Sequence, residues 1–247
     1  MFVAGIEGSG HHALKSVWFH LRNENPGIHV VEYDQVLHSF GIENNAAYHY
    51  SSISLETHKS HIEKYMQQQG NSTYKPSIFI DAQNSYPMGM GAGSLAHPDV
   101  LMLKRLDGVL FDLRVIILQR CPSKSTLSSV RRFKKDDPRY TYKTPSFQAR
   151  MVSESLAHLN NVLPSLPCGK LMVLSYEAFV EAPTDLAEPL AELLGLPVDH
   201  VLPAFADIKH QASSVLDAET QAIKVKLDEF FAQQSVLWPL LASARKP

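Results

Sequence analysis

The fold is decided by residues 1–12, MFVAGIEGSGHH, in which an apolar run is followed by three spaced glycines. From Ala13 to Leu21 apolar residues recur at spacings of three and four, which predicts an amphipathic helix. A strand, a glycine loop and a helix in this order can bind phosphate. The glycines let backbone N–H groups approach an anion, and the helix dipole adds positive charge at its N-terminus. The sequence therefore predicts an N-terminal phosphate-binding loop.

The spacing from Gly5 to His12 is that of the phosphate-loop motif G-x-x-x-x-G-K-[ST] of nucleoside triphosphatases. His11 stands where this motif has its lysine, and His12 stands where it has serine or threonine. The loop thus lacks both the lysine that contacts the phosphates and the hydroxyl that binds Mg²⁺. A nucleotide-dependent kinase or NTPase is an alternative function, which these two histidines disfavour.

Four further segments are short, apolar and separated by helical sequence: residues 28–33, 77–81, 113–118 and 171–174. Short apolar strands that alternate with helices are typical of a parallel sheet covered on both faces. We predict a single α/β domain over residues 1–247, a three-layer α/β/α structure with a central parallel sheet of about four to five strands. Ligands of such sheets bind beyond the carboxyl ends of the strands. Residues 5–12, 81–91 and 120–129 should therefore meet at one edge.

Composition limits the class of protein. The formal net charge of −2 argues against a general nucleic-acid-binding protein. Cys121 and Cys168 are too few for a disulfide framework, so a reducing compartment is expected. No run of residues reaches the ~18 apolar positions of a membrane span. We expect a cytoplasmic protein, or a Golgi-lumenal catalytic domain if a membrane anchor precedes this sequence; the oligomeric state stays open.

A second candidate phosphate site follows the strand over residues 113–118. Arg120 stands at the end of this strand, and Ser128 comes eight residues later, in the next predicted helix. The planar guanidinium fork and a hydroxyl donor suit a phosphate monoester. We predict that Arg120 binds phosphate; a structural ion pair is the alternative.

At this point the chain resembles, as a divergent member, the sulfotransferases that use 3'-phosphoadenosine 5'-phosphosulfate (PAPS). Ser9-Gly10-His11-His12 occupies the frame of their first phosphate motif, and Arg120-Cys121-Pro122 with Ser128 matches their second. Residues 174–197 are similar to their strand-Tyr-Glu segment and leucine-glycine-leucine helix. The resemblance spans about residues 2–200, with gaps. It implies PAPS as co-substrate, no metal, and a hydroxyl of a carbohydrate or small molecule as acceptor; a non-catalytic nucleotide-binding protein of this fold is the alternative.

The resemblance also implies which residues contact PAPS: Gly8, Ser9, Gly10, His11, His12, Arg120, Ser128, and Tyr176 near the adenine. The chain departs from the family at four places, the first being His11 and His12, which stand where the family has two hydroxyl residues. Gly8 stands where the family has lysine, and residues 83–87 (QNSYP) replace a Lys-Thr-His-x-Pro run. The Arg-Lys-Gly loop near the C-terminus of the small-molecule branch is missing.

Candidate catalytic residues follow from these departures. With no loop lysine, His11 and His12 are the expected donors to the departing 5'-phosphate. The alternative is that one histidine caps the helix and the other packs in the interior. Glu7 and Asp81 are the candidate bases, although an aspartate at a strand end can equally be a cap. His58 and His61 have a spacing compatible with a metal, but no further ligand set accompanies them.

Overall fold

The protein is described here by a computed structural model that covers the chain in separate ranges. These ranges are residues 1–6, 8–24, 29–32, 54–68, 77–80, 88–90, 94–96, 104, 107–109, 112–134, 144–165, 170–206 and 216–234. Helices and strands follow one another in this order: β1 (Phe2–Gly5), α1 (His11–Glu24), β2 (His29–Glu32), α3 (Leu55–Gln68), β3 (Ser77–Ile80), β4 (Met88–Met90), β5 (Ser94–Ala96), β6 (Val115–Gln119), α5 (Pro122–Lys134), α6 (Pro145–Val162), η5 (Leu163–Ser165), β7 (Leu171–Ser175), α7 (Tyr176–Glu181), η7 (Pro183–Leu186), α8 (Ala187–Leu194), α9 (Val198–Ala206) and α10 (Ala218–Ala232).

The central sheet is parallel and has the strand order β1-β6-β7. Its middle strand, β6, is buried along its first four residues and pairs with β1 on one side and β7 on the other. Gly5 of β1 lies opposite Leu118, and Gln119 at the end of β6 lies opposite Ser175. The three strands therefore end at one edge, and the segments that follow them start side by side.

The strand count in one sheet is lower than predicted. β2 and β3 form a separate parallel pair, and β4 and β5 form an antiparallel pair. Val31 of β2 packs in the same core as Phe2, whereas Ile78 of β3 packs in the opposite core with Val3. The β2–β3 pair thus lies at the level of the sheet, with side chains in both cores.

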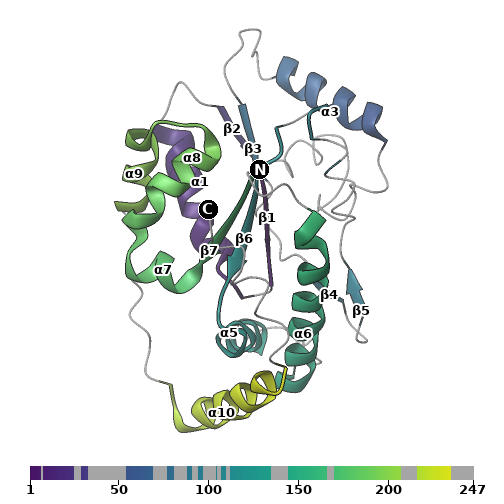
Figure 1. The fold of residues 1–247 in the computed structure, drawn as a ribbon, viewed down its shortest axis with the longest axis vertical. Coiled ribbons are helices and arrows are strands. Elements are labelled where there is room, and N and C mark those ends of the chain that lie inside the picture. The colour runs from purple at the N-terminus through teal and green to yellow at the C-terminus, as the bar shows by residue number, and fades with distance from the viewer. Residues whose placement is uncertain are drawn as a thin grey trace.

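Side chains on either face of the central sheet alternate as the strand period requires. Phe2, Val115 and Ile117 face a core with α3, α5, α6 and α10, whereas Val3 and Ile116 face a core with α1, α7, α8 and α9. Figure 1 shows α1, α7, α8 and α9 on one side of the strands and α6 on the other, with α5 and α10 below. The predicted three-layer α/β/α architecture with a parallel sheet is confirmed.

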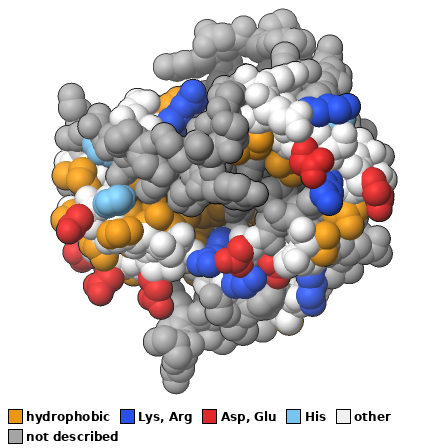
Figure 2. Space-filling model, turned by 90° about the horizontal axis from the view of Figure 1, so that it is seen from above, with side chains coloured by type: hydrophobic (Ala, Val, Ile, Leu, Met, Phe, Trp, Pro, Cys, Tyr) orange, Lys and Arg blue, Asp and Glu red, His pale blue; other side chains and the backbone are white. Residues whose placement is uncertain are grey.

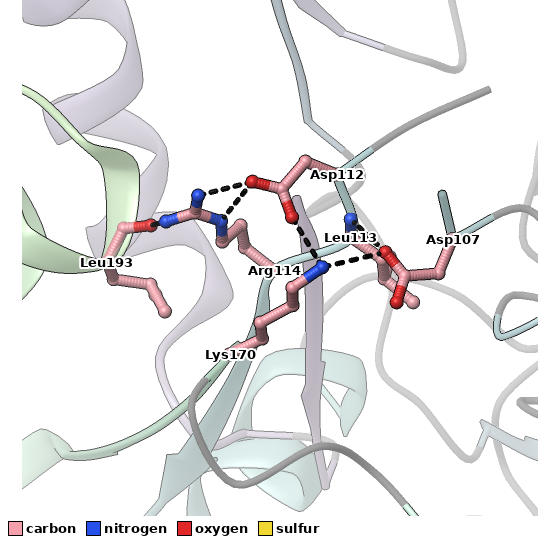
Figure 3. Close-up of polar contacts among 6 residues, drawn as sticks. All are labelled: Asp107, Asp112, Leu113, Arg114, Lys170 and Leu193. Atoms are coloured by element: carbon pink, nitrogen blue, oxygen red, sulfur yellow. Dashed lines mark hydrogen bonds and ion pairs between the residues drawn. The ribbon is translucent and has the colours of Figure 1, made fainter. Parts of the chain in front are cut away.

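At the edge where β6 and β7 begin, opposite the loops that follow the strands, charged side chains form a network (Figure 3). Its ion pairs and hydrogen bonds connect Asp107, Asp112, Leu113, Arg114, Lys170 and Leu193. Lys170 Nζ lies 3.1 Å from Asp107 Oδ1 and 2.6 Å from Asp112 Oδ1. Hydrogen bonds from Arg114 and Lys170 lower the pKa of Asp112 to about 2. The network joins the starts of neighbouring strands, and Arg114 extends it to the end of α8.

The surface charge is mixed on the face drawn in Figure 2, where Lys and Arg side chains lie beside Asp and Glu side chains. Among the described residues, no helix combines the length and apolar character that crossing a bilayer requires.

Candidate functional site

The loop between β1 and α1 turns sharply at two glycines. Gly8 has φ of +85° and Gly10 has φ of +113°, backbone conformations that L side chains rarely adopt. The N–H of Ser9 donates to the carbonyl of Ile6 at 3.1 Å. The carbonyl of Gly10 accepts from Ala13 N at 2.9 Å, so α1 starts directly behind the loop. The sequence forms this turn because glycine occupies both left-handed positions.

Gly8 also lacks room for any side chain. A Cβ atom built on Gly8 would lie 2.4 Å from the backbone oxygen of Ser125 in α5. A side chain at position 8 would therefore run into α5. Any side-chain cation in this site must therefore come from another position.

Arg120 connects the second candidate phosphate site to the loop. It follows β6, the neighbour of β1, and its Nη1 donates to the carbonyl oxygen of Gly8 at 2.6 Å. Its Cζ lies 4.2 Å from the ring centroid of Tyr176, which follows β7. The structure thus brings together three predicted site residues from the ends of three adjacent strands.

Tyr176 touches the loop as well as Arg120. A Cβ on Gly10 would lie 2.4 Å from Cδ2 and 2.8 Å from Cε2 of the Tyr176 ring. The ring therefore packs directly against the backbone of Gly10. Ser175, immediately before it, caps α7 by accepting from the N–H of Ala178. This cap fixes the direction in which Tyr176 leaves the end of β7.

The two histidines have different environments. His12 is exposed, whereas His11 is only 5% exposed, and its Nε2 is buried without a hydrogen-bond partner in the described part of the chain. Burial, and secondarily the charge of His12, lower the pKa of His11 to about 4. His11 is therefore neutral at pH 7. It packs in the interior, which is the alternative given above for one of the two histidines.

Helix α5, whose backbone at Ser125 packs against Gly8, carries three serines that form its hydroxyl face: Ser125, Ser128 and Ser129. Ser128, the predicted phosphate ligand, is half-buried. Ser125 lies three positions before Ser128 and four before Ser129, so it shares a side of the helix with each of them. Ser125 and Ser129 are fully buried, and neither Oγ has a partner among the described residues. Sequence reasoning missed both serines, although the spacing of three between Ser125 and Ser128 was a usable signal.

Other buried polar atoms of the site share this property. Within the described ranges, Ser9 Oγ and Arg120 Nε are also buried and without a hydrogen-bond partner. Leaving such a group unsatisfied costs about 1–3 kcal/mol. Donors from the loop, the end of β6 and α5 are therefore available for an oxyanion, whose oxygens accept hydrogen bonds.

Glu177 is a further charged residue at this edge that the sequence did not single out. Its Oε1 accepts from the backbone N–H of Cys121 at 3.4 Å and lies 3.7 Å from Lys124 Nζ. The carboxylate thus lies at the N-terminus of α5, where the helix dipole favours negative charge. It ties α5 to α7 beside Arg120.

The remaining predicted residues can be placed only in part. Glu7, Asp81 and residues 83–87 lie outside the described residues. His58 is buried in α3, which also carries His61. Over the described ranges, no group of three or more His, Cys, Asp or Glu side chains is placed to hold a metal ion.

Comparison with known proteins finds similarity at the level of structure. No protein-family model matches the chain, and no curated protein matches it. The chain is similar to the sulfotransferase domain of the Synechococcus PCC 7002 olefin synthase, at 18% identity and a TM-score of 0.47 over 94% of this chain and 93% of that one. It is similar to the sulfotransferase domain from the curacin biosynthetic pathway, at 15% identity and a TM-score of 0.43 over 92% and 97%.

A third similar structure is retinol dehydratase in complex with androsterone and the inactive cofactor PAP. It aligns at 12% identity and a TM-score of 0.45 over 93% of this chain and 79% of that one. At these TM-scores and identities the likenesses do not assign an activity. A function must come from the residues of the site.

Proposed function

We propose that this protein is a sulfotransferase that moves the sulfuryl group of PAPS to a hydroxyl of an acceptor. The observation that carries the proposal is the hydrogen bond from Arg120 to the carbonyl of Gly8. It joins two candidate phosphate sites that come from different strands. A ligand with more than one phosphate group can therefore use both sites.

The residues present fit this ligand. The N–H groups of the loop and the N-terminus of α1 would hold the 5' end, as helix N-termini hold anions. Arg120 and Ser128 would hold the 3'-phosphate, with the charged fork and hydroxyl that a monoester needs. The buried, unpartnered atoms Ser9 Oγ and Arg120 Nε support the assignment, because anionic oxygens would satisfy them.

When bound, PAPS supplies a sulfuryl group whose S–O bond to the 5'-phosphate breaks as sulfur bonds to the acceptor oxygen. His11 would carry its proton on Nε2 and donate a hydrogen bond to the departing phosphate oxygen. This role replaces the family's lysine, which contact with α5 excludes at position 8. An anion beside His11 favours the protonated form and so raises its pKa. Donors that stabilise the developing charge are the main source of rate in this kind of transfer.

His12, exposed at the start of α1, is the second proposed donor. The proton of the acceptor hydroxyl must pass to a base. Glu7 and Asp81 remain the proposed bases, from the sequence alone. A carbohydrate or small-molecule acceptor, a single domain and a cytoplasmic location are proposed from the sequence alone.

The test is titration calorimetry with 3'-phosphoadenosine 5'-phosphate (PAP) and, separately, with ATP and Mg²⁺. The proposal expects PAP to bind and Arg120→Ala to weaken it by about tenfold, the effect of one lost charged hydrogen bond. Binding of ATP with Mg²⁺ and not of PAP would contradict it in favour of an NTPase. A transfer assay with radiolabelled PAPS over sugars, phenols and lipids then separates an enzyme from a non-catalytic binding protein.

A further inference from the structure

Arg120 and Tyr176 close a chain of contacts around the tip of the phosphate loop. Arg120 Nη1 donates to Gly8 O at 2.6 Å, and Arg120 Cζ lies 4.2 Å from the ring centroid of Tyr176. The same ring packs against the backbone of Gly10. The chain of contacts therefore runs from one left-handed glycine to the other and encloses Ser9, whose Oγ is buried and unpartnered within the described residues.

We propose that Tyr176 is a positioning residue, which holds the Arg120 fork and the loop in the geometry that binds an anion. This inference rests on the proposed function for the identity of the ligand, PAPS. It differs from a contact between Tyr176 and adenine, the role that the sequence resemblance implies. Tyr176 acts through Arg120 and Gly10, so it affects the phosphates and not the base.

The stacking explains how one ring can set the direction of a guanidinium. An arginine side chain has several rotatable bonds. The Tyr176 ring restricts them, because the planar guanidinium group of Arg120 lies over the ring. With its plane fixed and Nη1 used on Gly8, Arg120 keeps Nη2 and the buried Nε as donors for a ligand. Without the ring, the guanidinium group of Arg120 must be ordered when the ligand binds, and the lost conformational entropy weakens binding.

The ring alone performs this role. The contacts to Gly10 come from Cδ2 and Cε2, and the contact to Arg120 is with the ring itself. Phenylalanine keeps these atoms and removes only the hydroxyl. Leucine and methionine fill part of the volume but offer no planar face. The series Tyr176→Phe, Tyr176→Leu and Tyr176→Met therefore separates stacking from hydrogen bonding.

The experiment measures affinity for two probes by calorimetry: PAP, and inorganic pyrophosphate, which has no base. We expect Tyr176→Phe to bind both within about twofold of the wild type, and Tyr176→Leu to bind both about tenfold more weakly. If Tyr176→Leu does not fold, Tyr176→Met should show the same weaker binding of both PAP and pyrophosphate. The control is Phe147→Leu, which removes a ring 5.7 Å from Arg150 on α6 and should change neither affinity. A variant that loses affinity for PAP but keeps pyrophosphate binding shows an adenine contact and overturns the inference.

A double-mutant cycle gives the second readout. If Tyr176 acts through Arg120, Tyr176→Leu should weaken pyrophosphate binding far less in an Arg120→Met background than in the wild type. Equal losses in both backgrounds would overturn the inference. A wild type that binds pyrophosphate but not PAP contradicts the proposed function and leaves the positioning role to be decided by the pyrophosphate data. A wild type that binds neither contradicts both.

Discussion

Gly8 is the most constrained single residue of the loop. Its carbonyl accepts from Arg120, its φ is left-handed, and its α-carbon faces the backbone of α5. Two independent penalties therefore act on a side chain at this position: backbone strain and collision with Ser125. Backbone atoms of a helix cannot move aside as the end of a flexible side chain can, so the collision is the larger penalty.

Gly8→Ala should lower the free energy of unfolding by about 1–3 kcal/mol and weaken PAP binding. Gly108→Ala is the matched control, because Gly108 has φ of +73° and nothing within 4 Å of a built Cβ. Gly108→Ala should lower the free energy of unfolding only by the backbone strain, about 1 kcal/mol, and leave PAP binding unchanged. Urea unfolding and calorimetry measure both effects. Equal losses in the two variants would show that contact with α5 does not constrain the loop.

His11 makes stability depend on pH. Histidine in the unfolded chain titrates near 6.5, whereas His11 in the folded chain titrates near 4. Between these values the unfolded state binds more protons, so stability falls as the pH falls. The loss should reach at most about 3 kcal/mol by pH 4, because the pKa is lowered from 6.5 to about 4.

His11→Asn should remove this dependence, which is measured as the difference in unfolding free energy between variant and wild type from pH 7 to pH 4. The difference isolates His11 from carboxylates that titrate in the same range. A pH profile that His11→Asn does not change would contradict the buried, neutral state.

At the scale of elements, α5 carries buried hydroxyls that stabilise nothing in the described structure. Removing an unsatisfied buried hydroxyl should relieve its desolvation penalty. Ser125→Ala and Ser129→Ala should therefore raise the free energy of unfolding by about 1 kcal/mol each and weaken PAP binding by about threefold. Opposite signs for stability and affinity are characteristic of a group kept for a ligand.

Ser153 on α6 provides the control for α5. Its Oγ is likewise buried without a partner in the described residues, but it lies on a different helix. Ser153→Ala should raise stability in the same way and leave PAP binding unchanged. The hydroxyl face of α5 would lose its proposed role if Ser125→Ala and Ser129→Ala left the affinity for PAP as it was.

The network at the start of β6 and β7 should affect stability alone. Asp107 Oδ1 accepts from the N–H of Leu113 at 2.9 Å and from Lys170, and these bonds lower the pKa of Asp107. Asp107→Asn should destabilise the fold by about 1 kcal/mol. The effect of Asp112→Asn should be smaller, because that side chain is 54% exposed. Urea unfolding measures both, and PAP affinity should not change because the network lies at the opposite edge from the loops.

At the scale of the whole molecule, the sheet and its two cores could be predicted because buried parallel strands are continuous apolar runs. Phe2–Ala4, Val115–Leu118 and Leu171–Leu174 are such runs, and each lies within a strand or forms most of it. The grouping of strands could not be predicted, because runs of this kind do not specify their neighbours. β2 and β3 therefore pair with each other, which apolar content alone does not indicate.

The meeting of the loop with Arg120 could also be predicted, since the carboxyl ends of parallel strands share an edge. Ser125, Ser129 and Glu177 could not. The roles of the two serines depend on how α5 is rotated about its own axis, and α5 packs against α6 and α10. The role of Glu177, on α7, depends on where the N-terminus of α5 lies. Sequence spacing shows which serines share a face but not what the face meets.

The order β1-β6-β7 has a consequence for how this protein can diverge. The loop, Arg120 and Tyr176 leave three adjacent strands, so the distances between them are inherited from backbone pairing at about 4.8 Å per strand. Backbone pairing is insensitive to side-chain identity. Substitutions at helix positions away from these strand ends can therefore accumulate without altering the distances between the loop, Arg120 and Tyr176.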